Sequence, residues 1–279
     1  MLTLTDEKLE QELVRLRTES PQVVNYSLLA AMLDNIGNLN SVLRDQLIYS
    51  SFAQWIDDYM ISNEQAVWLL RQVQQRNLLF SGIYERQNDA VYTRTFTALL
   101  LTSLIARDAR STFMTAEMRT HLFEDATQYL QLENDLRGLT EHGWAHAFGH
   151  GGDLLYYVCY HPKFPTRLIP QALAGIYHGI MLPSGFTAGK GSRLDNCLVA
   201  LLAQDRITES QLLNWLRGIQ GVIASTADQS LQFDQNNKLI NLCVSLAYKM
   251  RFESLSTPGL SAWLDEQIRD FYEANGTVA

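Results

Sequence analysis

Cysteine is scarce in this sequence, which has three cysteines among its 279 residues. Cys159, Cys197 and Cys243 are odd in number, lie far apart and each stand in an apolar run. A disulfide framework needs paired cysteines, whereas single cysteines in apolar segments behave as small buried hydrophobic residues. We therefore expect reduced, buried thiols, and we expect Cys159 to be inert because burial raises the pKa of a thiol.

Long hydrophobic runs and an excess of positive charge are also absent. The longest apolar stretch, 96–106, is interrupted by threonine and serine and is shorter than the ~18 residues that span a bilayer. A net charge of -8 and a pI near 5.2 disfavour nucleic acid as a partner. The segment 1–19 has the pattern of a charged amphipathic helix rather than of a secretory signal, which predicts a cytoplasmic protein.

The hydrophobic pattern is helical almost throughout the chain. A content of 47% hydrophobic and 19% charged residues indicates a globular protein. Apolar residues recur at spacings of three and four over 9–16, 28–36, 42–60, 66–73, 92–105, 118–132, 144–160, 168–181, 194–202, 212–223, 231–250 and 260–271. This predicts an all-α fold, an α/α superhelix of antiparallel helix hairpins (HEAT-like) with about twelve helices and no strand pair. No long linker divides the chain, so we expect a single domain over 1–279 with a Gly-rich loop at 183–192.

Four motifs follow one another along the chain. They are RDQLIYSSFAQWI at 44–56, VYTRTFTALLL at 91–101, LENDLRGLTEHGWAHAFGHGGDLL at 132–155 and SRLDN at 192–196. In this order they resemble the bacterial family catalogued as domain of unknown function 2785, over roughly residues 40–198. The resemblance implies an all-helical bacterial protein with no assigned activity. The function must therefore be argued from individual residues.

The third motif lies in a segment, 133–161, that holds four of the six histidines. A helix that begins near Gly143 would place a polar stripe at i, i+4, i+7 and i+11 on one face, formed by His146, His150, Asp153 and Tyr157. Trp144 would fall on the opposite, apolar face. Over 142–162 the only formal charge is Asp153, whereas a solvated face normally carries several. The stripe is therefore expected to line a cavity inside the fold.

We interpret this stripe as part of a polar pocket for a small polar molecule or peptide, because buried polar groups need partners. The expected ligand-binding residues are Trp144, His146, His150, Asp153, Tyr157, Arg137 and Glu133. Glu133 and Arg137 stand four residues apart, so they could equally form an ordinary surface ion pair. Arg137 could instead hold a carboxylate or phosphate, and similar arginines beside apolar helices are Arg44, Arg94 and Arg193.

A divalent metal such as zinc is the alternative occupant, with His146, His150 and Asp153 as its ligands. Such a site would make the protein a metal-dependent hydrolase. It would not be a zincin, because Ala147 stands where that motif has its catalytic glutamate. In a third hypothesis the stripe is a polar core network, and the protein is a structural scaffold without pocket chemistry. The sequence leaves these alternatives and the oligomeric state open.

Overall fold

The structure, a computed structural model, describes residues 5–19, 24–85, 87–183 and 191–276. Within these residues the chain forms twelve α-helices, three short helices of other types and a two-stranded hairpin. The elements in chain order are α1 (Asp6–Glu19), α2 (Tyr26–Asp34), η1 (Val42–Tyr49), α3 (Ser50–Asp57), α4 (Asn63–Gln75), η2 (Leu78–Phe80), α5 (Ala90–Arg110), α6 (Ala116–Leu132), β1 (Leu139–Thr140), β2 (Gly143–Trp144), α7 (Ala147–Tyr160), η3 (Thr166–Leu168), α8 (Ile169–Met181), α9 (Gly191–Ala203), α10 (Glu209–Ala224), α11 (Gln229–Phe252) and α12 (Pro258–Ala274).

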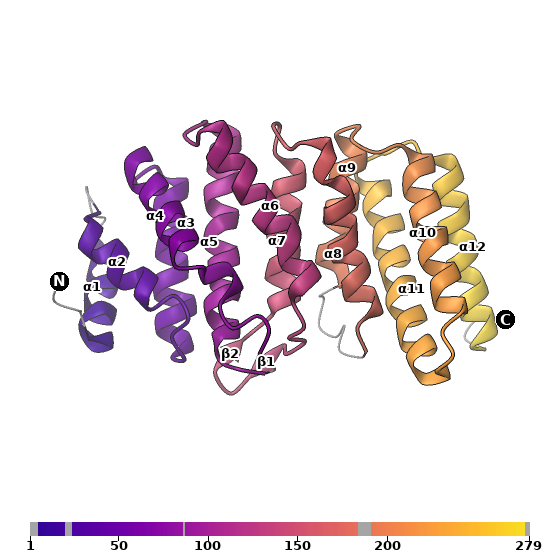
Figure 1. The fold of residues 1–279 in the computed structure, drawn as a ribbon, viewed down its shortest axis with the longest axis horizontal. Helices are drawn as coiled ribbons and strands as arrows, with labels where there is room; N and C mark the ends of the chain where they lie inside the picture. The colour runs from indigo at the N-terminus through magenta and orange to yellow at the C-terminus, as the bar shows by residue number, and fades with distance from the viewer. Residues whose placement is uncertain (1–4, 20–23, 86, 184–190, 277–279) are drawn as a thin grey trace.

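The helices stack side by side along the long axis of the molecule, from α1 at one end to α12 at the other (Figure 1). One layer contains α3, α5, α7, α9 and α11, and each of these helices packs against the next. In the second layer α6 packs against α8, while α10 and α12 pack together at the C-terminal end. The predicted all-α fold of stacked helices, with about twelve members, is confirmed and is consistent with a superhelix.

Local sequence signals explain where several helices begin. The Ser62 hydroxyl accepts a hydrogen bond from the backbone N–H of Gln65, and the Gln65 side chain accepts one from the N–H of Ser62. Thr208 and Gln211 make the same reciprocal pair at the start of α10. Such capping boxes satisfy two backbone donors that a helix start leaves without partners.

Helix α5 is largely buried in the hydrophobic core. Leu100, Leu101 and Leu104 are among its buried apolar residues. Thr102 donates its hydroxyl proton to the carbonyl of Ala98 at 2.8 Å, which satisfies a polar group inside the core. Among the described residues, no helix is both long enough and apolar enough to cross a membrane.

The segment between α6 and α7 differs from the helix that we expected to begin near Gly143. The chain leaves α6 at Leu132, forms the β1–β2 hairpin and enters α7 only at Ala147, so both the early helix start and the expected absence of a strand pair are wrong here. Gly143 has a φ of +85°, and a Cβ on it would lie 2.8 Å from the Cβ of Ser41. His146 also adopts a left-handed backbone, with a φ of +48°. These two turns stop a continuous helix.

A second difference concerns the segment 42–60, which the periodicity predicts as one α-helix. The structure has a π-helix, η1, followed by α3. The wider winding of a π-helix shifts the side chains relative to a regular 3.6-residue repeat. Arg44 consequently points into the protein interior and is fully buried.

The three cysteines are buried and free, as predicted. The Sγ atoms of Cys159 on α7 and Cys197 on α9 lie 3.2 Å apart. Burial, together with the neighbouring Cys197 thiol, raises the pKa of Cys159 well above its ordinary value, which agrees with an inert thiol. Most of the predicted Gly-rich loop at 183–192, namely 184–190, lies outside the described residues.

Candidate ligand-binding pocket

The predicted polar stripe is formed in part by α7. His150, Asp153 and Tyr157 lie on this helix, whereas His146 immediately precedes it. The ring centroids of His146 and His150 are nevertheless 5.7 Å apart, so the left-handed turn keeps the two imidazoles together. Trp144 lies on β2, where its ring stands edge-on to that of His146 at 4.3 Å. With 42% of its surface exposed, Trp144 is not part of a buried apolar face, and that expectation was wrong.

Three of these residues, Trp144, His146 and His150, line a pocket of about 470 Å³, which we call the His150 pocket. Its polar lining residues are Asp45, Tyr49, His146, His150 and Arg193, and its apolar ones are Phe96, Leu99 and Trp144. A larger groove of about 720 Å³ adjoins it and is lined by Asp153 and Tyr157 among others. Tyr49 on η1 and Leu99 on α5 line both spaces, so the two lie next to each other.

Two lining residues, Asp45 and Tyr49, come from the π-helix η1 and were not among the residues predicted for the site. The spacing of apolar residues in the sequence did not indicate that Asp45 and Tyr49 would line a pocket. Both residues belong to the motif at 44–56, and this motif was the one feature of the sequence that could have pointed to them. π-Helical segments are rare and are often found at functional sites. The position of both residues on η1 therefore supports this pocket as the candidate site.

An ion pair between α7 and α9 joins Arg193, which lines the pocket, to Asp153, which lines the adjoining groove. The Nη1 atom of Arg193 contacts Asp153 directly and lies 3.5 Å from Nδ1 of His150. His150 Nδ1 is also 3.5 Å from a carboxylate oxygen of Asp153. The side chains are partly exposed, at 37% for Arg193, 26% for Asp153 and 14% for His150. This triad therefore faces both the protein and the pocket.

A second ion pair joins Asp45, which lines the pocket, to the buried Arg44. Arg44 Nε is 2.7 Å from Asp45, and its other nitrogens donate to the carbonyls of Asn38 and His142 at 2.6 and 2.7 Å. The guanidinium also stacks between the rings of Tyr92 and Phe96, with its carbon 4.5 and 4.8 Å from their centroids. Arg44 therefore has a structural role, because its buried guanidinium holds the Asp45 carboxylate in place.

Burial changes the acidity of Asp45 and Tyr49. Desolvation raises the pKa of Asp45, and the charge of Arg44 offsets this only in part. Desolvation also raises the pKa of Tyr49, and the nearby Asp153 carboxylate raises it further. Tyr49 therefore keeps its phenolic proton at neutral pH, so it is a hydrogen-bond donor toward the pocket.

The glycines of α7 allow the close helix packing that holds the pocket residues in place. A Cβ on Gly149 would lie 2.8 Å from Nδ1 of His146, and one on Gly151 would lie 2.7 Å from the ring of Tyr129 on α6. A Cβ on Gly152 would lie 3.3 Å from the Cβ of Arg193 on α9. Close approach of neighbouring groups thus compensates for the low helix propensity of glycine.

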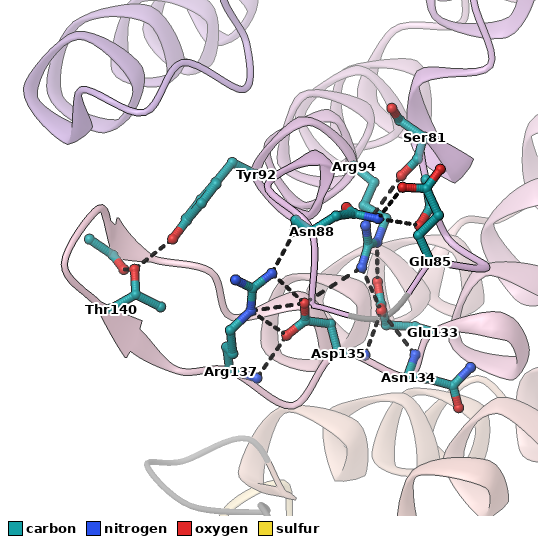
Figure 2. Close-up of polar contacts among 12 residues, drawn as sticks. Ser81, Glu85, Asn88, Tyr92, Arg94, Glu133, Asn134, Asp135, Arg137 and Thr140 are labelled. Carbon is teal, nitrogen blue, oxygen red and sulfur yellow. Dashed lines mark hydrogen bonds and ion pairs between the residues drawn. The ribbon is translucent and has the colours of Figure 1, made fainter.

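Glu133 and Arg137 belong to a different set of contacts, which we call the Arg94–Glu133 cluster (Figure 2). Arg94 donates to the two carboxylate oxygens of Glu133 at 2.6 and 3.0 Å. Tyr129 and two backbone N–H groups complete the shell of Glu133, whose side chain is 0% exposed. Arg137 pairs with Asp135 at 2.6 Å. The interpretation of Glu133 and Arg137 as a surface ion pair is therefore wrong, and neither residue lines the His150 pocket.

The arrangement gives little support to a metal centre. In the parts of the chain that the structure describes, no group of three or more His, Cys, Asp and Glu side chains is placed to hold a metal ion. The predicted ligand Asp153 is instead engaged by Arg193. We considered four arginines as residues that could hold an anion. Of these, Arg193 lines the pocket, whereas Arg137, Arg94 and Arg44 do not.

Comparison with known proteins gives one match. A family described as "Protein of unknown function (DUF2785)" matches residues 79–248, which include α5 to α10, most of α11 and the residues from Trp144 to Arg193 that line the pocket. No curated protein and no solved structure matches the chain. The match covers more than half of the sequence, so the chain belongs to the DUF2785 family, as its motifs indicated.

Proposed function

We propose that this protein is a binding module that holds a small polar molecule or peptide in the His150 pocket. The supporting observation is that polar groups from three separate elements meet there. Asp45 and Tyr49 come from η1, His150 from α7 and Arg193 from α9. The volume of about 470 Å³ falls within the range of ~300–1,000 Å³ that is typical of small-molecule sites.

The wider setting of this proposal follows from the same features. We propose that the chain is one domain, a helical-repeat stack that works in the cytoplasm without a nucleic-acid partner. Three buried, reduced thiols suit a reducing compartment, and the net charge of -8 opposes binding to a phosphate backbone.

Ligand-dependent stabilisation tests the binding function. We would screen the full-length protein against small polar metabolites and short peptides by thermal unfolding, because a ligand that binds only the folded state raises the melting temperature. We expect at least one such compound to raise it in the wild type and to fail with His150→Ala. His121→Ala is the matched control, since the His121 side chain is 62% exposed on α6. A compound that stabilises the His150→Ala variant as well would place its site elsewhere.

A metal-dependent hydrolase that uses His146, His150 and Asp153 stays a prediction with weaker support, because Asp153 is paired with Arg193. Elemental analysis of protein purified without added metal tests it. Stoichiometric metal that disappears from a folded His146→Ala/His150→Ala double variant would favour the hydrolase over the binding module.

A further inference from the structure

We propose that the ligand of the His150 pocket and its adjoining groove is a neutral oligosaccharide. This inference rests on the proposed binding function and adds the chemical class of the ligand. Three features carry it: the charge balance of the lining residues, the mixture of hydrogen-bonding groups, and the aromatic rings along the groove.

The charges that line the pocket are already neutralised by the protein. Asp153 pairs with Arg193, and Asp45 pairs with the buried Arg44 at 2.7 Å. A cationic ligand would have to compete with a guanidinium for either carboxylate, and an anionic ligand would have to compete with Asp153 for Arg193. Bringing a further charge into a partly buried site is unfavourable when the charges of its described lining residues are already paired with each other. A ligand without net charge avoids this cost.

The same side chains still offer hydrogen bonds to a neutral ligand. Arg193 uses Nη1 for Asp153 and His150, and a guanidinium has five N–H groups in all. Asp45 uses one oxygen for Arg44, and a carboxylate has two. Tyr49 adds a phenolic donor. Each sugar hydroxyl is both a donor and an acceptor, so a row of hydroxyls matches donors and acceptors that alternate around one pocket.

Aromatic rings line both spaces. Trp144, which is 42% exposed, stands at the His150 pocket, while Tyr157 and Tyr160, 37% and 47% exposed, stand in the adjoining groove. The apolar C–H face of a sugar ring packs on such rings, and the indole and phenol groups bond to its hydroxyls. Tyr49 lines both spaces, so one chain of linked sugar rings would extend from the pocket into the groove.

An extended peptide is the less suitable occupant of this surface. A peptide bound in an extended conformation brings one amide N–H and one carbonyl per residue, and these need regularly spaced partners such as a free sheet edge. The groove is lined by residues of α3, α5 and α7, whose backbone groups are used within the helices. It therefore has no main-chain ladder to offer to a peptide.

A glycan array probed with the full-length protein, followed by calorimetric titration with the mono-, di- and tetrasaccharide of the best neutral glycan, tests the inference. We expect affinity to rise with chain length. Trp144→Ala should weaken binding of all three by about tenfold, the loss expected for one stacking contact. Trp144→Phe should retain most of the affinity. Tyr157→Ala should weaken only the longer saccharides, because Tyr157 lines the groove and not the His150 pocket.

Tyr84→Ala is the matched control, since Tyr84 is 83% exposed and lines neither space. The melting temperature of each variant without ligand shows whether it is folded. If neutral glycans fail to bind while charged metabolites or peptides stabilise the protein through His150, the pocket stands and the ligand class is wrong. If glycans bind equally to wild type and Trp144→Ala, the saccharide inference is overturned. If no compound of any class binds, the binding function falls as well.

Discussion

The Arg94–Glu133 cluster and the His150 pocket contain the same types of side chain but differ in what surrounds them. In the cluster, Arg94 and Glu133 are 1% and 0% exposed, and every partner of the carboxylate is a protein group (Figure 2). In the pocket, Asp153 and Arg193 are 26% and 37% exposed and border two open spaces. The first set of charges fixes the chain, whereas the second has hydrogen-bonding capacity left for a ligand.

The motif at 132–155 contributes residues to both regions. Its first half, around Glu133, ends α6 and turns the chain into the hairpin, where Asp135 and Arg137 hold an extended segment against Asn88. Its second half, around His150, begins α7 and faces the pocket. Removing a charge should therefore cost stability in the first half and binding in the second.

The largest expected effect on stability comes from Glu133→Gln. This change removes the carboxylate that Arg94 contacts directly and leaves only Asp135, at 3.9 Å, to balance the buried guanidinium. Breaking a buried ion pair in this way typically costs about 3–5 kcal/mol. Asp153→Asn is the matched control, and we expect it to change the free energy of unfolding by less than about 1 kcal/mol because the Asp153–Arg193 pair is partly exposed. Urea unfolding of both variants measures the difference. Equal losses in the two would show that burial does not separate the cluster from the pocket.

Asp108 on α5 extends the comparison, because it is a second carboxylate surrounded by protein donors. Burial favours a raised pKa, but hydrogen bonds from His161, Arg119 and the backbone N–H groups of Met114 and Phe113 outweigh burial and hold the pKa well below its ordinary value. A lowered folded-state pKa stabilises the protein above the unfolded value of about 3.9, and this contribution is lost as the pH falls below that value.

We therefore expect the free energy of unfolding to fall between about pH 4 and pH 2, and to fall less steeply in Asp108→Asn. Chemical unfolding at a series of pH values measures the two slopes. The Asp108→Asn variant will be less stable at neutral pH, so the slope rather than the absolute value is the test. Parallel pH profiles for the two proteins would contradict the assignment.

The smallest effect concerns the glycines that bring α7 close to its neighbours. A Cβ on Gly151 would lie 2.6 Å from Leu130 and 2.7 Å from Tyr129, so Gly151→Ala should destabilise the protein by about 1–3 kcal/mol through overpacking. At Gly218 on α10 a Cβ would meet nothing within 4 Å, so Gly218→Ala should stabilise it by up to about 1 kcal/mol through helix propensity. Thermal unfolding of the two variants measures the difference. If close packing explains Gly151, the melting temperature falls in Gly151→Ala and rises in Gly218→Ala.

Much of the fold could be predicted from the sequence because helix formation and helix faces depend on nearby residues. Each of the twelve periodic segments overlaps an α-helix in the structure, and Phe148, Leu154 and Val158 occupy the buried face of α7. The lining of the His150 pocket could be predicted only in part. His146 and His150 stand out in the sequence because they are four residues apart, whereas Asp45 and Tyr49 were missed because a π-helix does not follow the 3.6-residue period. That these residues bind a ligand stays a prediction.

The sequence by itself determined the all-α architecture, the family and the buried, reduced cysteines, since periodicity, motif order and composition are local properties of the chain. Tertiary structure alone decided which charges pair. Glu133 meets Arg94, 39 residues away, rather than Arg137, four residues away, and Asp153 meets Arg193 across two packed helices. The physical reason is that burial and counterions are supplied by elements distant in sequence, and these decide whether a charged side chain supports the fold or faces a ligand.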